Sequence, residues 1–203
     1  MSIGSALMGS SPVEASKEKV ILVDTMPGNQ VNPCFGRPIQ GGTTNGYEKG
    51  AATLTTSERV RVTKVKLPLT VDGSEPGTVQ VTIVGSRAFE SDPTGSGYWS
   101  SIPDEAVELG RTTAEVSTTT APCAQPEIVT ARFNPAVRLK PDQLYWVVVQ
   151  DAAGSQRSYF WAASTSLSDE WTHAIFIRDG NGARWVSYDP GTFAPNALRV
   201  IGR

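Results

Sequence analysis

Hydrophobic residues along this chain alternate with polar ones at the two-residue period of β-strands, and no segment keeps a helical period over three turns. Pro or Gly interrupts the alternation roughly every ten residues, a spacing typical of β-sandwiches. We therefore expect an all-β fold. The pattern predicts a two-sheet antiparallel β-sandwich of jelly-roll type that spans residues 19–203 as a single domain.

The predicted strands and connections follow from this pattern. Residues 30–50 and 86–110 are predicted to be loops, and 112–126 an exposed connection, because Gly, Pro and Thr dominate them. The predicted strands cover 19–23, 58–69, 78–84, 128–133, 144–149, 159–163, 174–178, 183–187 and 196–201.

The turn residues predict two hairpins and one further turn. The strands at 58–69 and 78–84 are expected to form a hairpin, and Asn134-Pro135 to form a turn after 128–133. The segment Asp179-Gly180-Asn181-Gly182 is a strong hairpin signal between the two strands that flank it.

The strand at 58–69 changes phase in its middle. Val60 and Val62 point one way, and the alternation resumes one position out of phase from Val65. A β-bulge near Thr63-Lys64 keeps both halves facing the core. The other face carries the charges of Arg59, Arg61, Lys64 and Lys66. These charges form either a basic ligand surface or an ordinary solvated sheet face.

The segment 144–149 is apolar on both faces, which predicts the most central strand of a sheet. Trp146 and Trp161 lie inside apolar strands and are assigned to the core. Trp171 and Trp185 have polar neighbours, so their placement stays open.

Residues 1–16 are small and polar, a composition that is disordered in an isolated domain. We expect residues 1–18 to form an extended N-terminal arm that becomes ordered on a neighbouring subunit, with Ile3, Leu7 and Met8 as its anchors. The segment lacks the basic n-region and the longer apolar run of a secretory signal.

Charge and hydropathy exclude several classes of partner. The net charge is −2, which gives no electrostatic case for nucleic acid or an anionic membrane. No run approaches the roughly 20 apolar residues that span a bilayer. The two cysteines, Cys34 and Cys123, form either one long-range disulfide or two free thiols.

The chain lacks the residue sets of the common catalysts. His173 is its only histidine, so a zinc site is not expected. We also expect no other metal and no cofactor. No nucleophile, metalloprotease, phosphate-binding or dinucleotide motif occurs, and the Asp and Glu residues are scattered. We expect a protein that is not an enzyme.

One loop offers a candidate contact site. Tyr98 and Trp99 follow Gly95 and Gly97 within the predicted loop, which favours either an exposed aromatic site or a cap on the sandwich. In the first case the rings stack on a sugar or anchor a subunit contact. Neighbouring polar groups such as Asp104 or Arg111 are then available for sugar hydroxyls.

Four segments carry a family resemblance over about three-quarters of the chain: 61–67, 75–81, 137–148, and Trp185 together with 197–202. The most distinctive is 137–148, where a Pro-Asp turn leads into Tyr145-Trp146 and a central strand. Together they resemble the choice-of-anchor type of β-sandwich module, a jelly-roll-like domain of bacterial surface and phage proteins. The resemblance implies the fold and leaves the function open.

Without a signal or a sorting segment, the resemblance favours a protein assembled in the cytoplasm. We therefore expect a structural subunit of a phage-like virion, specifically a capsid decoration or surface protein that docks on a major capsid protein or another subunit through its arm. It could also form a homo-oligomer. The alternative function is a carbohydrate-binding or host-adhesion module that uses Tyr98 and Trp99.

Overall fold

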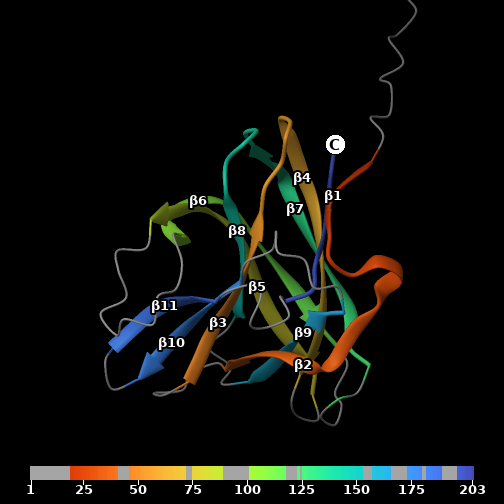
Figure 1. Cartoon of the computed structure of the whole chain (residues 1–203). Coiled ribbons are helices and arrows are strands. Elements are labelled where there is room, and N and C mark those ends of the chain that lie inside the picture. Colours follow the sequence, from red (N-terminus) through yellow and green to blue (C-terminus); the bar gives the residue numbers. More distant parts are fainter. Residues whose placement is uncertain are drawn as a thin grey trace, which may run out of the picture.

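The chain folds as the expected all-β sandwich, in which two antiparallel sheets pack against each other (Figure 1). The computed structural model describes residues 19–40, 46–71, 75–88, 101–117, 123, 125–152, 157–165, 173–179, 182–188 and 196–203. A one-turn 3-10 helix at Pro27–Asn29 interrupts the strands, and no helix among the described residues is long and apolar enough to cross a membrane.

The first sheet is built around β4, which has β7 along one edge. Along the other edge of β4, β12 followed by β1 pairs with one part, and β9 followed by β2 pairs with the rest. Its strands are β1 (Val20–Asp24), β2 (Val31–Gln40), β4 (Val60–Val71), β7 (Glu127–Leu139), β9 (Ser158–Ser164) and β12 (Arg199–Gly202).

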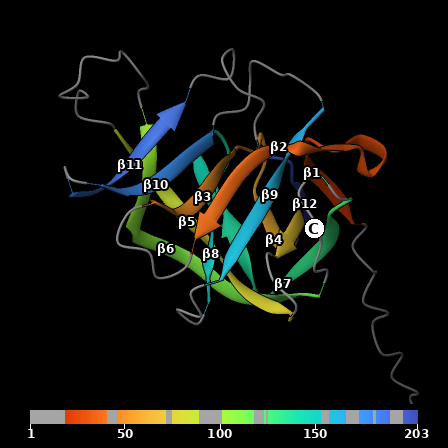
Figure 2. The same ribbon diagram turned by 90° about the horizontal axis from the view of Figure 1, so that it is seen from below.

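The second sheet has the order β11-β10-β3-β8-β5-β6, so that β8 is a central strand as predicted (Figure 2). The hairpin of β10 and β11 is confirmed, with Asp179 paired to Gly182. The strands are β3 (Gly46–Leu54), β5 (Gly77–Ala88), β6 (Ser101–Val116), β8 (Tyr145–Asp151), β10 (His173–Asp179) and β11 (Gly182–Tyr188).

The main core lies between the two sheets and is supplied by alternate residues of their strands. The predicted bulge in β4 is confirmed, because Val62 and Lys64 pair with the consecutive residues Gly202 and Ile201 of β12, which leaves Thr63 as an extra residue. The extra residue lets both halves of β4 face the core. Members of this core include Val62, Val65, Leu67, Leu69, Val79, Val81, Ile83, Val147, Val149 and Trp161.

The predicted hairpin of 58–69 with 78–84 is wrong, because β4 and β5 belong to opposite sheets. Each strand has one apolar face, and these faces cover each other across the core instead of lying side by side. The connection after Val71 therefore crosses from one sheet to the other.

The loop predicted at 30–50 is also wrong, since β2 and most of β3 lie within it. The register of β2 against β9 shifts between Asn32 and Gly36, which accommodates the Pro and Gly residues that suggested a loop. Ile39 from this segment is fully buried in the main core.

Two other predicted connections contain long strands. Residues 101–116 form β6, and β7 runs through Asn134-Pro135, whose peptide bond is cis. Residues 133–136 of β7 lie opposite Thr63 alone, between the pairs Val62–Val137 and Lys64–Arg132. The expected turn is thus a bulge within a continuous strand, in which Asn134 and Pro135 are exposed and Phe133 is buried in the main core.

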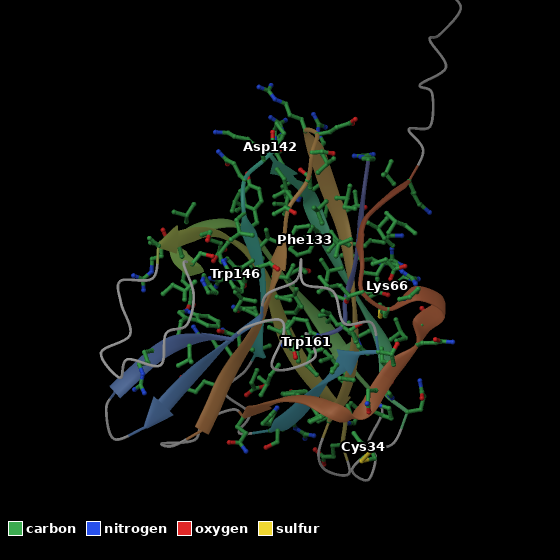
Figure 3. The ribbon with its side chains drawn as sticks, viewed as in Figure 1. Cys34, Lys66, Phe133, Asp142, Trp146 and Trp161 are labelled. Carbon is green, nitrogen blue, oxygen red and sulfur yellow. A yellow bond between two sulfur atoms is a disulfide. The ribbon has the colours of Figure 1, made fainter. Side chains whose placement is uncertain are left out.

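A second apolar cluster covers the outer face of the second sheet. Trp146 and Trp161 are both fully buried, as predicted, but only Trp161 lies between the sheets (Figure 3). Trp146 belongs to the outer cluster, and Trp185 proves to be buried beside it. This cluster comprises Ala51, Val84, Ile102, Trp146, Val148 and Trp185.

The two cysteines form a disulfide. Cys34 in β2 is bonded to Cys123, with Cα atoms 4.3 Å apart and a sequence separation of 89. Both residues are exposed at one end of the sandwich (Figure 3). The bond joins the first sheet to the connection that precedes β7.

Candidate functional site

A polar hollow lies on the outer face of the second sheet, next to the apolar cluster. Its volume is about 130 Å³. It is built from side chains of β3, β5, β6 and β8, namely Lys49, Gln80, Thr82, Val84, Glu105, Glu108, Arg111, Val148 and Gln150.

The shape of the hollow comes from the path of β6. The register between β5 and β6 shifts twice, so that Val84 pairs with Glu108 but Gly85 pairs with Asp104. Residues 105–107 therefore leave the ladder, and the arch they form lies against β5 at Gly85, where a Cβ atom would come within 3.0 Å of Val107 Cγ1. The arch carries Glu105, and Val107 within it is 51% exposed.

Glu105 is held by two partners from distant parts of the chain. Lys49 Nζ on β3 lies 2.5 Å from Glu105 Oε2, and Trp185 Nε1 on β11 donates a hydrogen bond to Oε1 at 3.0 Å. Glu108 and Arg111 form a second ion pair beside it. The carboxylate is thus fixed before any ligand arrives, which lowers the entropic cost of binding.

A wider hollow of about 420 Å³ continues from Glu105 and is lined by Arg87, Pro103, Asp104, Glu105, Ala106 and Trp185. Carboxylates, a guanidinium group and an indole that is mostly covered gather in this space. Such a mixture suits a neutral ligand rich in hydroxyl groups, whose oxygens both donate and accept hydrogen bonds.

The predicted contact residues Tyr98 and Trp99 lie outside the described residues. The segment that contains them joins Ala88 to Ser101, which are paired at the ends of β5 and β6. Arg87, which precedes Ala88 in β5, lines the wider hollow. Asp104 and Arg111, which the sequence suggested as polar neighbours, each line one of the two hollows.

Sequence reasoning missed the pair Lys49–Glu105 and its contact with Trp185. These residues belong to three strands that are far apart in the chain, and none of them stands in a motif. Within the described ranges, no group of three His, Cys, Asp or Glu side chains is placed to hold a metal ion.

A second exposed feature is β1, at the border of the first sheet. Val20 and Ile21 are 50% and 56% exposed, and in the described part of the chain β1 pairs only with β12. The predicted arm, residues 1–18 with Ile3, Leu7 and Met8, lies outside the described residues and leads directly into this strand.

Comparisons with known proteins assign no family. No family model matches the chain, and no curated protein matches it. Among solved structures, an aminopeptidase from the marine sediment archaeon Thaumarchaeota archaeon is similar at 13% identity with a TM-score of 0.30. The match covers 75% of this chain but 25% of the aminopeptidase, and so low a TM-score carries neither its fold nor its activity to this chain.

Proposed function

We propose that this protein is a non-enzymatic structural subunit of a phage-like virion, most specifically a decoration or surface protein of the capsid. The observation that supports the proposal is the exposed edge strand β1, which directly follows segment 1–18. In this view the arm and β1 together dock on a neighbouring virion subunit.

The physical argument rests on the two aliphatic side chains of β1. An exposed sheet edge that carries Val20 and Ile21 is an aggregation hazard unless a partner covers it. An extended segment such as 1–18 gains main-chain hydrogen bonds when it adds to a neighbour's sheet, and Ile3, Leu7 and Met8 fill small pockets there. Both features favour a protein whose surface is completed by assembly.

The test uses particles banded on a density gradient from cells that carry the gene. The full chain is expected in these particles at a fixed ratio to the main shell protein. The chain without residues 1–18 is expected to remain folded but to be absent from them. Absence of the full chain from the particles, or full occupancy by the truncated chain, would overturn the proposal.

The hollow around Glu105 favours a second candidate function, the binding of a carbohydrate. Its fixed carboxylate accepts a hydrogen bond from Trp185, and Tyr98 and Trp99 precede the same strand, β6, in the sequence. Sugars are recognised by such pairs of polar groups and rings, because each ring has an apolar face and a rim of hydroxyls.

A glycan array tests this candidate with the full chain, Glu105→Gln and Trp99→Ala. The matched control is Glu115→Gln, which removes the same charge from an exposed position of β6 outside both hollows. Glycan binding that only the first two variants lose would support the candidate. An array without any bound glycan would reject it.

A further inference from the structure

The outer face of the first sheet carries rows of basic side chains that run across neighbouring strands. Arg61 pairs with Arg138 on β7, and it exchanges both backbone hydrogen bonds with Arg203, at 3.0 and 3.1 Å. In the next row Lys64 pairs with Arg132. We call this surface the basic face; it consists of Arg61, Lys64, Lys66, Arg132, Arg138 and Arg203.

The bulge in β4 creates this arrangement. Thr63 is an extra residue relative to β12, so Val62 and Val65 both face the core, whereas Arg61 and Lys64 both face outward. Neighbouring strands lie about 4.8 Å apart, so directly opposed side chains on this face are close neighbours. Figure 3 shows Lys66 on the side of the sandwich opposite Trp146.

The charges of the basic face are not balanced by acidic neighbours. In the described part of the chain, the salt bridge beside this face is Asp24–Arg199, at 3.0 Å, and no member of the face takes part in a salt bridge. Arg132 foremost, and then Lys19, holds the pKa of Lys64 below its ordinary value, with smaller contributions from burial and Lys66.

Like charges directly opposite each other destabilise a sheet. The chain as a whole is slightly acidic, with 20 Asp and Glu against 18 Lys and Arg, so this concentration of positive charge is local. A surface that is unfavourable in the isolated molecule becomes favourable when an anionic partner covers it.

Aliphatic side chains adjoin the basic rows. Ile21 on β1 pairs with Ile201 on β12, which in turn pairs with Lys64, so one row runs Ile21–Ile201–Lys64–Arg132. Arginine is enriched at protein interfaces, and the exposed Ile21 beside the basic rows adds apolar area that a partner would cover. The strands that form the basic rows, β1, β12, β4 and β7, contain one aromatic residue, Phe133, which is buried, and Phe160 on the neighbouring β9 is half-buried. Single-stranded nucleic acids are bound on exposed aromatic rings.

We propose that the basic face and the adjoining Ile21 and Ile201 bind an acidic protein surface, in which Asp and Glu side chains meet the Arg and Lys rows and an apolar residue covers the isoleucines. The inference rests on the proposed function in taking that surface to belong to a neighbouring subunit of the particle. It adds the chemistry of the neighbour, which the arm alone does not define.

The binding test uses the full chain and a short peptide in which Glu alternates with Val. The double variant Lys64→Gln/Arg132→Gln is expected to weaken peptide binding by about tenfold or more, and Ile21→Ser to weaken it less. The matched control is Arg157→Gln/Arg184→Gln, which removes equal charge from positions outside the basic face and both hollows and is expected to bind as the unaltered protein does.

Melting temperatures check that the double variant is folded, since neither substitution removes a buried group. Equal weakening in the control pair would show that only net charge matters and would overturn the proposal. Duplex DNA and a heparin fragment of equal charge are tested in the same way. The proposal would also be overturned if either one binds more tightly than the peptide and Ile21→Ser leaves that binding unchanged. The partner would then be a polyphosphate or a sulfated sugar.

The particle assay separates this inference from the proposed function. If the double variant joins the particles at full occupancy, the basic face is not the docking surface, although the protein remains a virion subunit. If the protein is absent from the particles but binds the peptide as expected, the proposed function fails and the basic face stands.

Discussion

Gly50 of β3 lies directly against the indole of Trp161 on the facing sheet: a Cβ atom at Gly50 would come within 3.1 Å of Trp161 Cε3. The ring has little room to retreat, because it is fully buried and its Nε1 donates a hydrogen bond to the carbonyl oxygen of Ala197 at 2.7 Å. The absence of a side chain at Gly50 thus sets the distance between the sheets at this point.

Gly50→Ala is expected to lower the free energy of unfolding by about 1–3 kcal/mol, the usual cost of overpacking a core. Urea denaturation measures the loss. In a Trp161→Phe background the smaller ring leaves space for the methyl group, so the same substitution should cost less there. An equal cost in both backgrounds would show that Trp161 is not the cause.

Trp146→Ala is expected to destabilise the protein by about 3–5 kcal/mol, because it leaves a large cavity in the outer cluster. The substitution also removes the hydrogen bond from Trp146 Nε1 to Ser86 Oγ, 3.2 Å long. Ser86→Ala isolates that smaller contribution. Thermal and urea melts that differ little from those of the unaltered chain would contradict the assignment of Trp146 to a packed cluster.

Replacing both cysteines, Cys34→Ser/Cys123→Ser, is expected to cost about 4 kcal/mol in stability. In the loop-closure model a crosslink over 89 residues removes much of the freedom of the unfolded chain. Both side chains are exposed, so lost packing contributes little. Adding a reductant should shift the unfolding midpoint of the unaltered protein to that of the double variant. An unfolding midpoint that the reductant does not change would argue against the disulfide.

Lys64→Gln is expected to raise the melting temperature at low salt, because it removes the repulsion from Arg132, Lys19 and Lys66. The difference should shrink as salt screens the charges. Arg111→Gln, which breaks the ion pair with Glu108 on the other sheet, is the contrasting control and should not stabilise.

The pH dependence follows from the lowered pKa of Lys64. Its charged form is disfavoured in the folded state, so at pH values between its folded pKa and the unfolded value near 10.5 the unfolded chain binds more protons. The contribution of Lys64 to stability therefore rises with pH across that alkaline window. The difference in melting temperature between Lys64→Gln and the unaltered chain should narrow there, and a constant difference would contradict the assignment.

Trp99→Ala is expected to weaken assembly while leaving the melting temperature nearly unchanged, because aromatic anchors often supply much of an interface's energy. Particle occupancy and a thermal melt measure the two effects. Loss of glycan binding without loss of assembly would favour the second candidate function. A large drop in melting temperature alone would place Trp99 in the core.

The sequence by itself determined the elements that follow from the local alternation of hydrophobic and polar residues. The bulge of β4, the central place of β8 and the hairpin of β10 with β11 all follow from the side-chain period and from the turn residues. The burial of Trp146 and Trp161 follows in the same way. Such features depend on neighbours in the chain, which the sequence displays directly.

Only the tertiary structure decided which strands distant in sequence pair and which of their side chains meet. The strands β2, β3 and β6 contain Gly, Pro or irregular stretches, and they are strands because they satisfy the backbone groups of β9, β8 and β5. The same holds for the sites: Glu105 meets Lys49 and Trp185, and Lys64 meets Arg132, through the register of strands distant in sequence. Hydrogen bonding between distant strands sets that register, and no local pattern encodes it.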